Sequence, residues 1–159
     1  MSGINSYDVR QYVIKPALME ADMWTQSAEN LIVGIGLVET NFEYLKQIGN
    51  VPGGGLGIFQ MQKLTHDDLV RYALGASGKA NTILHVSNCY DFNSDSLVYN
   101  LIYATLMTRL FFARDPDPLP AAGDYQAMAE LHKLKYNSPK GKTDLDVSIP
   151  LFKIACQGN

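Results

Sequence analysis

The sequence has few of the residues that mark metalloproteins or disulfide-rich proteins. Two of its 159 residues are cysteines, Cys89 and Cys156, and three are histidines. The cysteine spacing matches no zinc or redox motif, so we expect two free thiols, although a disulfide between them is also compatible with the sequence. Three scattered histidines indicate no metal site. The sequence therefore predicts neither a metal nor another cofactor.

Long apolar runs and an excess of positive charge are also missing. No apolar stretch reaches the roughly 18 residues that a membrane span needs. The N-terminus lacks a basic start followed by an apolar run, so we expect no signal peptide. The formal net charge is −3, and the lysines and arginines are scattered. This distribution argues against general nucleic-acid binding.

What remains is typical of a soluble globular protein. Hydrophobic residues make up 47% of the sequence and charged residues 18%, which is too apolar for a disordered chain. The length fits one domain with one core. We therefore expect residues 1–159 to form a single domain that folds without a metal or disulfide.

The hydrophobic pattern predicts a mainly α-helical fold. Helices are expected over residues 8–20, 26–39, 65–74, 97–114, 124–135 and 144–155, with a polar loop over 137–143. Residues 75–93 should be irregular or contain a short helix around 79–86. Pro16 indicates a break or a new first turn in the first helix, and Thr65–Asp68 has the form of a capping box. Residues 31–38 are apolar on every side, which favours a buried helix but leaves a buried strand open.

Residues 49–57 contain five glycines and one proline, which predicts a loop or the turn of a short β-hairpin. Any strands should be confined to about residues 47–62. A phosphate-binding loop is excluded because no Lys-Ser or Lys-Thr pair follows the glycines. Glycines allow a ligand to approach the backbone closely, and the Gln60 amide offers both a donor and an acceptor to a sugar or acetamido group.

Glu39 is the most conspicuous ionisable residue because it ends the apolar segment 31–38. A carboxyl group that leaves a buried helix and enters a cleft is partly desolvated, and desolvation disfavours the charged form of a carboxyl group. A general acid needs this effect to keep its proton near neutral pH. The alternative is an ordinary surface glutamate at a helix end.

Taken together, these segments resemble lytic transglycosylases and goose-type lysozymes. Those enzymes place a catalytic Glu, usually followed by Ser, at the end of a core helix, and a Gly-Leu-Met-Gln-like segment follows. The counterparts here are Glu39-Thr40-Asn41-Phe42 and Gly57-Ile58-Phe59-Gln60-Met61. Residues 28–66 as a whole, including the Thr65-His66 pair, are most similar to phage-encoded members. Thr40 in place of Ser keeps the hydroxyl group, and Ile58-Phe59 in place of Leu-Met keeps an apolar pair.

A third family element is a Tyr-Asn pair late in the domain, which Tyr136-Asn137 supplies. In the family this tyrosine lies near the catalytic Glu and the pair lines the saccharide cleft. Residues 100–109 are similar to the middle helix of the family, and the resemblance implies that Tyr103 faces the cleft. The implied substrate-binding residues are Thr40, Gln60, Tyr103, Tyr136 and Asn137.

The resemblance implies a lysozyme-like peptidoglycan-cleaving enzyme, a muramidase-type glycosidase in which one Glu serves as both acid and base. Its substrate would be the β-1,4 bond between N-acetylmuramic acid and N-acetylglucosamine, and its product either a 1,6-anhydromuramoyl end or, by hydrolysis, a reducing end. Glu43, Asp67 and Asp68 are other carboxylates that we expect to lie on the surface. The alternative from another class is a catalytically silent virion or wall-binding protein with the same fold.

The implied partners are peptidoglycan glycan strands, with other bacteriophage virion proteins as further candidates. The implied location is a phage virion, or the host cytoplasm before delivery to the periplasm. Without a signal peptide of its own, the protein would depend on another factor for this delivery.

Overall fold

The computed structural model describes residues 3–49, 51–137 and 143–159, and helices dominate this part of the chain. The order of the elements is α1 (Ser6–Val9), η1 (Arg10–Ile14), α2 (Lys15–Glu20), α3 (Gln26–Glu39), α4 (Lys63–Tyr72), η2 (Ala73–Ser77), α5 (Ala80–Val86), α6 (Ser96–Tyr99), α7 (Leu101–Ala113), α8 (Tyr125–Leu131), η3 (His132–Tyr136) and α9 (Leu145–Cys156). The three η segments are π-helical turns that continue or join α-helices. The prediction of a mainly α-helical fold is confirmed.

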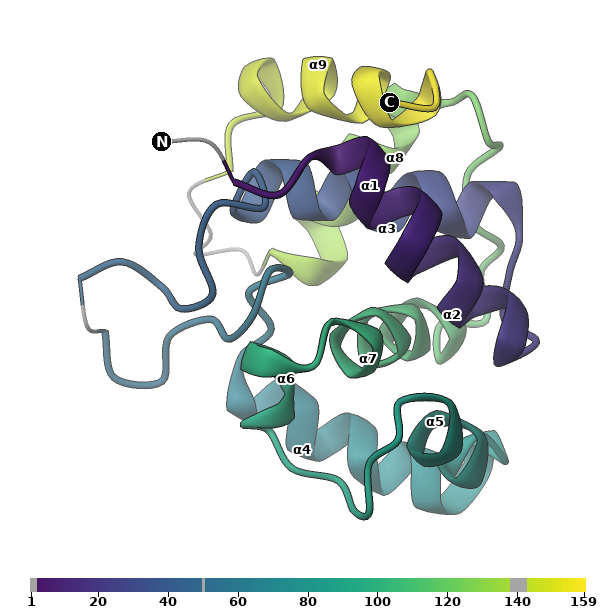
Figure 1. The fold of residues 1–159 in the computed structure, drawn as a ribbon. Coiled ribbons are helices and arrows are strands. Elements are labelled where there is room, and N and C mark those ends of the chain that lie inside the picture. Colours follow the sequence, from purple (N-terminus) through teal and green to yellow (C-terminus); the bar gives the residue numbers. More distant parts are fainter. Residues whose placement is uncertain (1–2, 50, 138–142) are drawn as a thin grey trace.

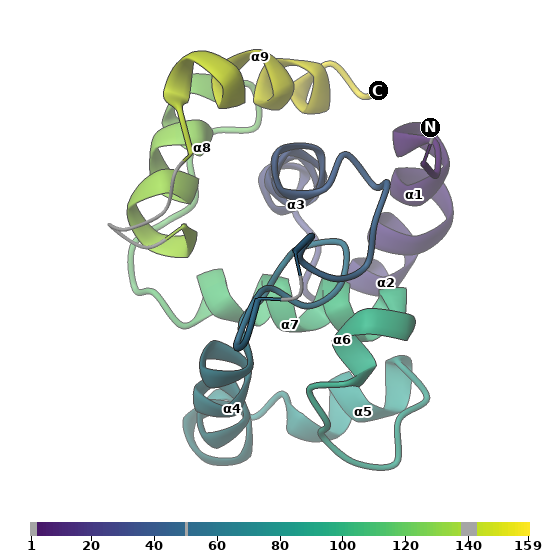
Figure 2. The same ribbon diagram turned by 90° about the vertical axis from the view of Figure 1, so that its left-hand side faces the viewer.

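Helix α3 runs through the centre of the molecule. It has α9 on one side, the α1–α2 segment on another and α7 below, as Figures 1 and 2 show from two directions. Every residue from Ala28 to Leu37 is buried. The apolar run 31–38 is therefore a buried helix, and the alternative of a buried strand is wrong.

Two glycines let neighbouring side chains lie directly against the α3 backbone. A Cβ atom on Gly34 would lie 2.1 Å from the Phe152 ring of α9, and one on Gly36 would lie 2.2 Å from the Phe42 ring. Contacts this short do not occur between real atoms, so both positions need glycine for the observed packing. Gly34 thus lets α9 pack close to α3, and Gly36 makes room for the ring of Phe42.

Pro16 marks a new first turn, which is one of its two predicted forms, whereas the helix expected after Ser96 differs from its prediction. Pro16 stands in the first turn of α2, directly after the π-helical turn η1, so the chain continues as a helix through Glu20. The long apolar helix expected after Ser96 is divided at Asn100, whose side chain caps α7 by accepting from the Tyr103 N–H.

The predicted capping box at Thr65–Asp68 is wrong. Helix α4 begins at Lys63, after Gln62, and Thr65 lies inside the helix. The predicted loop over residues 137–143 falls mostly on residues 138–142, which lie outside the described residues.

The glycine-rich segment does not form a regular hairpin within residues 51–62. Two isolated antiparallel bridges, Lys46 with Leu56 and Leu56 with Met61, fold it back on itself. Gly57 has a φ of +76°, and a Cβ atom there would lie 1.9 Å from the Leu97 carbonyl oxygen. A residue with a side chain would therefore separate this segment from α6.

The hydrophobic core links α3 to helices from both ends of the chain, with Leu18, Ile35, Leu106 and Phe152 among its fully buried members. Cys89 and Cys156 are both free thiols. Across the described ranges, each helix is too short or too polar to span a membrane.

Candidate active site

Glu39 is the last residue of α3, where the buried helix reaches the surface. Its side chain is 18% exposed, and its Oε1 atom lies 2.8 Å from Nε2 of His132. His132 is completely buried at the start of η3. One side of the Glu39 carboxyl group thus contacts the buried His132, and the rest is accessible to solvent.

Two aromatic rings enclose His132. Its ring is stacked with that of Tyr136, with centroids 5.6 Å apart, and tilted against Phe152 of α9, with centroids 5.8 Å apart. Burial, and then the negative charge of Glu39, raise the pKa of the Tyr136 phenol well above its usual value. Tyr136 therefore remains a neutral hydrogen-bond donor beside Glu39.

Tyr136 and Thr40 attach the glycine-rich segment to this site. The Tyr136 hydroxyl donates to the Phe59 carbonyl oxygen at 2.6 Å, and the Thr40 hydroxyl donates to the Ile58 carbonyl oxygen at 2.8 Å. Thr40 is only 3% exposed, so in this structure it supports the segment from behind. These two bonds place residues 58–60 next to the end of α3.

Tyr44 contacts the backbone at the end of α3. Its hydroxyl donates to the Glu39 carbonyl oxygen at 2.8 Å. Burial raises the pKa of Tyr44, and the negative charges of Glu39 and Glu43 raise it further. Tyr44 therefore stays protonated and keeps this bond near neutral pH.

Gln60 and Asn137 are both partly exposed. Gln60 has a φ of +53°, and its side-chain amide donates to the Gly57 carbonyl oxygen at 2.8 Å. This bond uses one of the two N–H donors of the amide, so the amide keeps both a donor and an acceptor for a ligand. Asn137 directly follows Tyr136, and its backbone N–H donates to the His132 carbonyl oxygen where η3 ends.

Tyr103 belongs to a separate buried group. It is completely buried, and its hydroxyl lies 2.7 Å from Nε2 of His66, whose Nδ1 lies 2.9 Å from the Asp67 carboxylate. Burial raises the pKa of Tyr103. In this structure the ring of Tyr103 faces the interior, and its predicted contact with substrate stays a prediction.

The contacts therefore join Glu39, Thr40, Tyr136 and residues 58–60, which come from three distant parts of the sequence. They also bring in His132, which no sequence motif marks as a site residue. A signal for its burial was present, because His132 follows the buried Met128 and Ala129 at the spacing of one helix face. A buried histidine needs a polar partner, and Glu39 is that partner.

The other candidate carboxylates are engaged elsewhere. Asp68 pairs with Arg114 and Arg71, and Asp67 pairs with Lys63, all at exposed or half-exposed positions. These cations and hydrogen bonds hold the pKa of both aspartates below the usual value. Glu43 is exposed and accepts a bond from Asn41 at 2.9 Å. Asp67 also contacts the buried ring of His66, so its surroundings resemble those of Glu39, but it belongs to the separate group around Tyr103.

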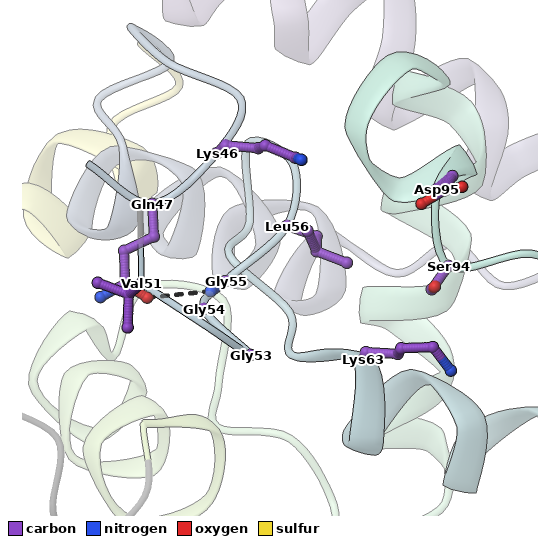
Figure 3. A pocket seen from close by; sticks show the side chains of 10 residues that line it. All are labelled: Lys46, Gln47, Val51, Gly53, Gly54, Gly55, Leu56, Lys63, Ser94 and Asp95. Carbon is purple, nitrogen blue, oxygen red and sulfur yellow. Dashed lines mark hydrogen bonds between the residues drawn. The ribbon is translucent and has the colours of Figure 1, made fainter. Parts of the chain in front are cut away.

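A pocket of about 290 Å³ lies along the glycine-rich segment. Gly53, Gly54 and Gly55 form one side, and Ser94 and Asp95, just before α6, form the other, as Figure 3 shows. Gln47 stiffens the glycine side by accepting from the Gly55 N–H at 3.0 Å. The pocket offers backbone groups, the Ser94 hydroxyl, the Asp95 carboxylate and the ammonium group of Lys46 to a polar ligand.

Comparisons with protein-family models, with curated proteins and with solved structures found no match to this chain.

Proposed function

We propose that this protein cleaves the glycan strands of peptidoglycan as a lysozyme-like lytic transglycosylase, with Glu39 as its general acid and base. The observation that carries the proposal is the position of the Glu39 side chain and its contact with His132. Glu39 has a partly exposed carboxyl group at the end of a buried helix, with one oxygen 2.8 Å from a fully buried histidine. A carboxyl group that is partly exposed and hydrogen-bonded on its buried side is placed to transfer a proton to and from a substrate.

In the first step, protonated Glu39 donates its proton to the glycosidic oxygen between N-acetylmuramic acid and N-acetylglucosamine. The bond from this oxygen to C1 of the muramoyl residue breaks, and the N-acetylglucosamine end leaves as an alcohol. Positive charge develops on the muramoyl ring. The 2-acetamido group of the substrate stabilises this charge in place of a second protein carboxylate.

In the second step, the ionised Glu39 acts as the base. It takes the proton of the muramoyl 6-hydroxyl while that oxygen attacks C1, which gives a 1,6-anhydromuramoyl end and returns Glu39 to its protonated form. If water attacks C1 instead, the same two proton transfers give a reducing end by hydrolysis. Both outcomes require only one acidic residue.

The neighbouring residues have supporting roles in this proposal. The side chains of Gln60 and Asn137 orient the acetamido groups, because both residues are partly exposed near the groups that hold Glu39. Tyr136 and Thr40 keep residues 58–60 at a fixed distance from Glu39. The pocket beside the glycine-rich segment would take a further part of the glycan strand.

The setting of this activity is part of the proposal. A wall-cleaving enzyme carried in a phage virion, or made in the host cytoplasm and then delivered to the periplasm, would reach glycan strands with the help of other proteins. Virion proteins are the partners that this setting implies.

The experiment is digestion of purified peptidoglycan by the wild-type protein, with mass spectrometry of the released muropeptides. Anhydro products, lighter by one water than the corresponding reducing ends, support the transglycosylase. Reducing ends alone support the hydrolytic form of the same site. Binding to peptidoglycan without cleavage would overturn the proposal in favour of a silent wall-binding protein.

A further inference from the structure

The environment of the second ring nitrogen of His132 determines how this residue acts on Glu39. Nε2 faces the Glu39 carboxyl group at 2.8 Å, whereas Nδ1 is buried and has no hydrogen-bond partner among the described residues. The rings of Tyr136 and Phe152 pack against the imidazole, and its side chain is completely buried. The two nitrogens thus stand in very different surroundings.

A proton on Nδ1 would be a buried N–H donor without an acceptor, and unpaired buried N–H groups are rarer in proteins than acceptors with an unused lone pair. The doubly protonated imidazolium would carry the same orphan N–H. The neutral ring with its proton on Nε2 avoids this cost, because its one N–H points at Glu39. The packing around His132 therefore selects one tautomer.

We propose that His132 is a positioning residue for the reaction proposed above, a neutral imidazole whose Nε2–H donates to Oε1 of Glu39 and reserves Oε2 for the transferable proton. When Glu39 is protonated, its proton must lie on Oε2, because Oε1 already accepts from His132. Oε2 is then the atom that faces the glycosidic oxygen.

The hydrogen bond from His132 to Glu39 also favours the transfer of the proton from Glu39 to the glycosidic oxygen. A hydrogen bond to a carboxylate is about twice as strong as one to a neutral carboxyl group. His132 therefore stabilises Glu39 more after the proton has left than before, which is the differential stabilisation that lowers a barrier. His132 itself exchanges no proton with the substrate.

The tautomer can be measured without reference to activity. Two-bond ¹H–¹⁵N spectra of the ¹⁵N-labelled wild-type protein at pH 7 distinguish protonated from bare ring nitrogens, and His132→Gln assigns the signal. We expect a neutral ring with the proton on Nε2. A ring protonated on Nδ1, alone or together with Nε2, would overturn the proposal.

Kinetics on purified peptidoglycan test the consequence. His132→Phe keeps a flat ring without a donor, and His132→Gln places an amide N–H near the position of Nε2. We expect His132→Phe to lower kcat by about 10- to 100-fold with little change in KM, since a hydrogen bond to a charged group contributes on this order. His132→Gln should recover most of the loss, and His85→Gln, at an exposed position, should match wild type.

These outcomes separate the two proposals. An inactive wild-type protein would overturn the proposed function, whatever the tautomer of His132. An active wild-type protein whose folded His132→Phe variant keeps its kcat, or whose Gln variant is impaired as much as the Phe variant, would overturn the positioning role alone.

Discussion

At the scale of single residues, Tyr136 has the clearest structural task, because its hydroxyl is the donor that holds the Phe59 carbonyl oxygen at 2.6 Å. Tyr136→Phe would leave this buried carbonyl group without that donor. We expect a loss of about 1–3 kcal/mol in the free energy of unfolding, the usual cost of such an unsatisfied group. Urea unfolding followed by circular dichroism measures this loss.

The matched control for Tyr136→Phe is Tyr90→Phe, because Tyr90 is fully exposed. Its stability should equal that of wild type. A Tyr136→Phe protein as stable as the Tyr90→Phe protein would show that the bond to Phe59 contributes nothing.

The residues of the candidate site were predictable to different degrees. Glu39 ends an apolar run, so its position at the end of a buried helix could be inferred locally. His132 lies 93 residues away in the sequence, and only the packing of α8 against α9, and of α9 against α3, brings it to Glu39. Thr40 and Tyr103 were predicted to touch substrate, but local pattern does not determine burial, and both lie in the interior.

At the scale of elements, the contact of α3 with α9 depends on Gly34. A methyl group there would lie 2.1 Å from the Phe152 ring, so α9 or the ring must move. We expect Gly34→Ala to lower the free energy of unfolding by about 1–3 kcal/mol, the range for an overpacked core, although alanine favours helix formation. Thermal unfolding measures the change.

Gly75→Ala is the matched control for Gly34→Ala, because a Cβ atom on Gly75 in η2 has no neighbour within 4 Å. It should be neutral or slightly stabilising. Equal unfolding temperatures for the two variants would contradict the close packing of α3 against α9.

Most helices were predictable because apolar residues recur at helical spacing. The residues at which the helices begin and end were harder to predict. Helix α4 starts at Lys63 without a side-chain cap, so no capping pattern marks its beginning. The division at Asn100 depends on the side chain of one residue, which bonds both the Tyr103 N–H and the Ser87 carbonyl oxygen. Such a tertiary contact leaves no periodic signal in the sequence.

At the scale of the whole molecule, one buried ion pair joins three elements. Arg10 in η1 donates to Glu29 of α3 at 2.8 Å, and to the Ala155 carbonyl oxygen of α9. The two side chains are only 2% and 4% exposed. Arg10→Met would leave the Glu29 charge buried, and we expect a loss of about 3–5 kcal/mol in the free energy of unfolding. Urea unfolding tests it.

Two further variants define this effect. Arg71→Met removes an exposed partner of Asp68 and should change the stability by less than about 1 kcal/mol. Adding Glu29→Leu to Arg10→Met removes the buried charge and should restore part of the loss. An Arg10→Met protein no less stable than Arg71→Met would contradict the role of this pair.

The central claim is that Glu39 transfers the protons in peptidoglycan cleavage. The most direct measurement compares the rates at which wild type, Glu39→Gln and Glu43→Gln release muropeptides from purified peptidoglycan. We expect Glu39→Gln to remain folded, because its amide oxygen can still accept from His132, and to lose about 10²- to 10⁴-fold in rate. Glu43→Gln should stay close to wild type. A folded Glu39→Gln protein that cleaves as fast as wild type would contradict the claim.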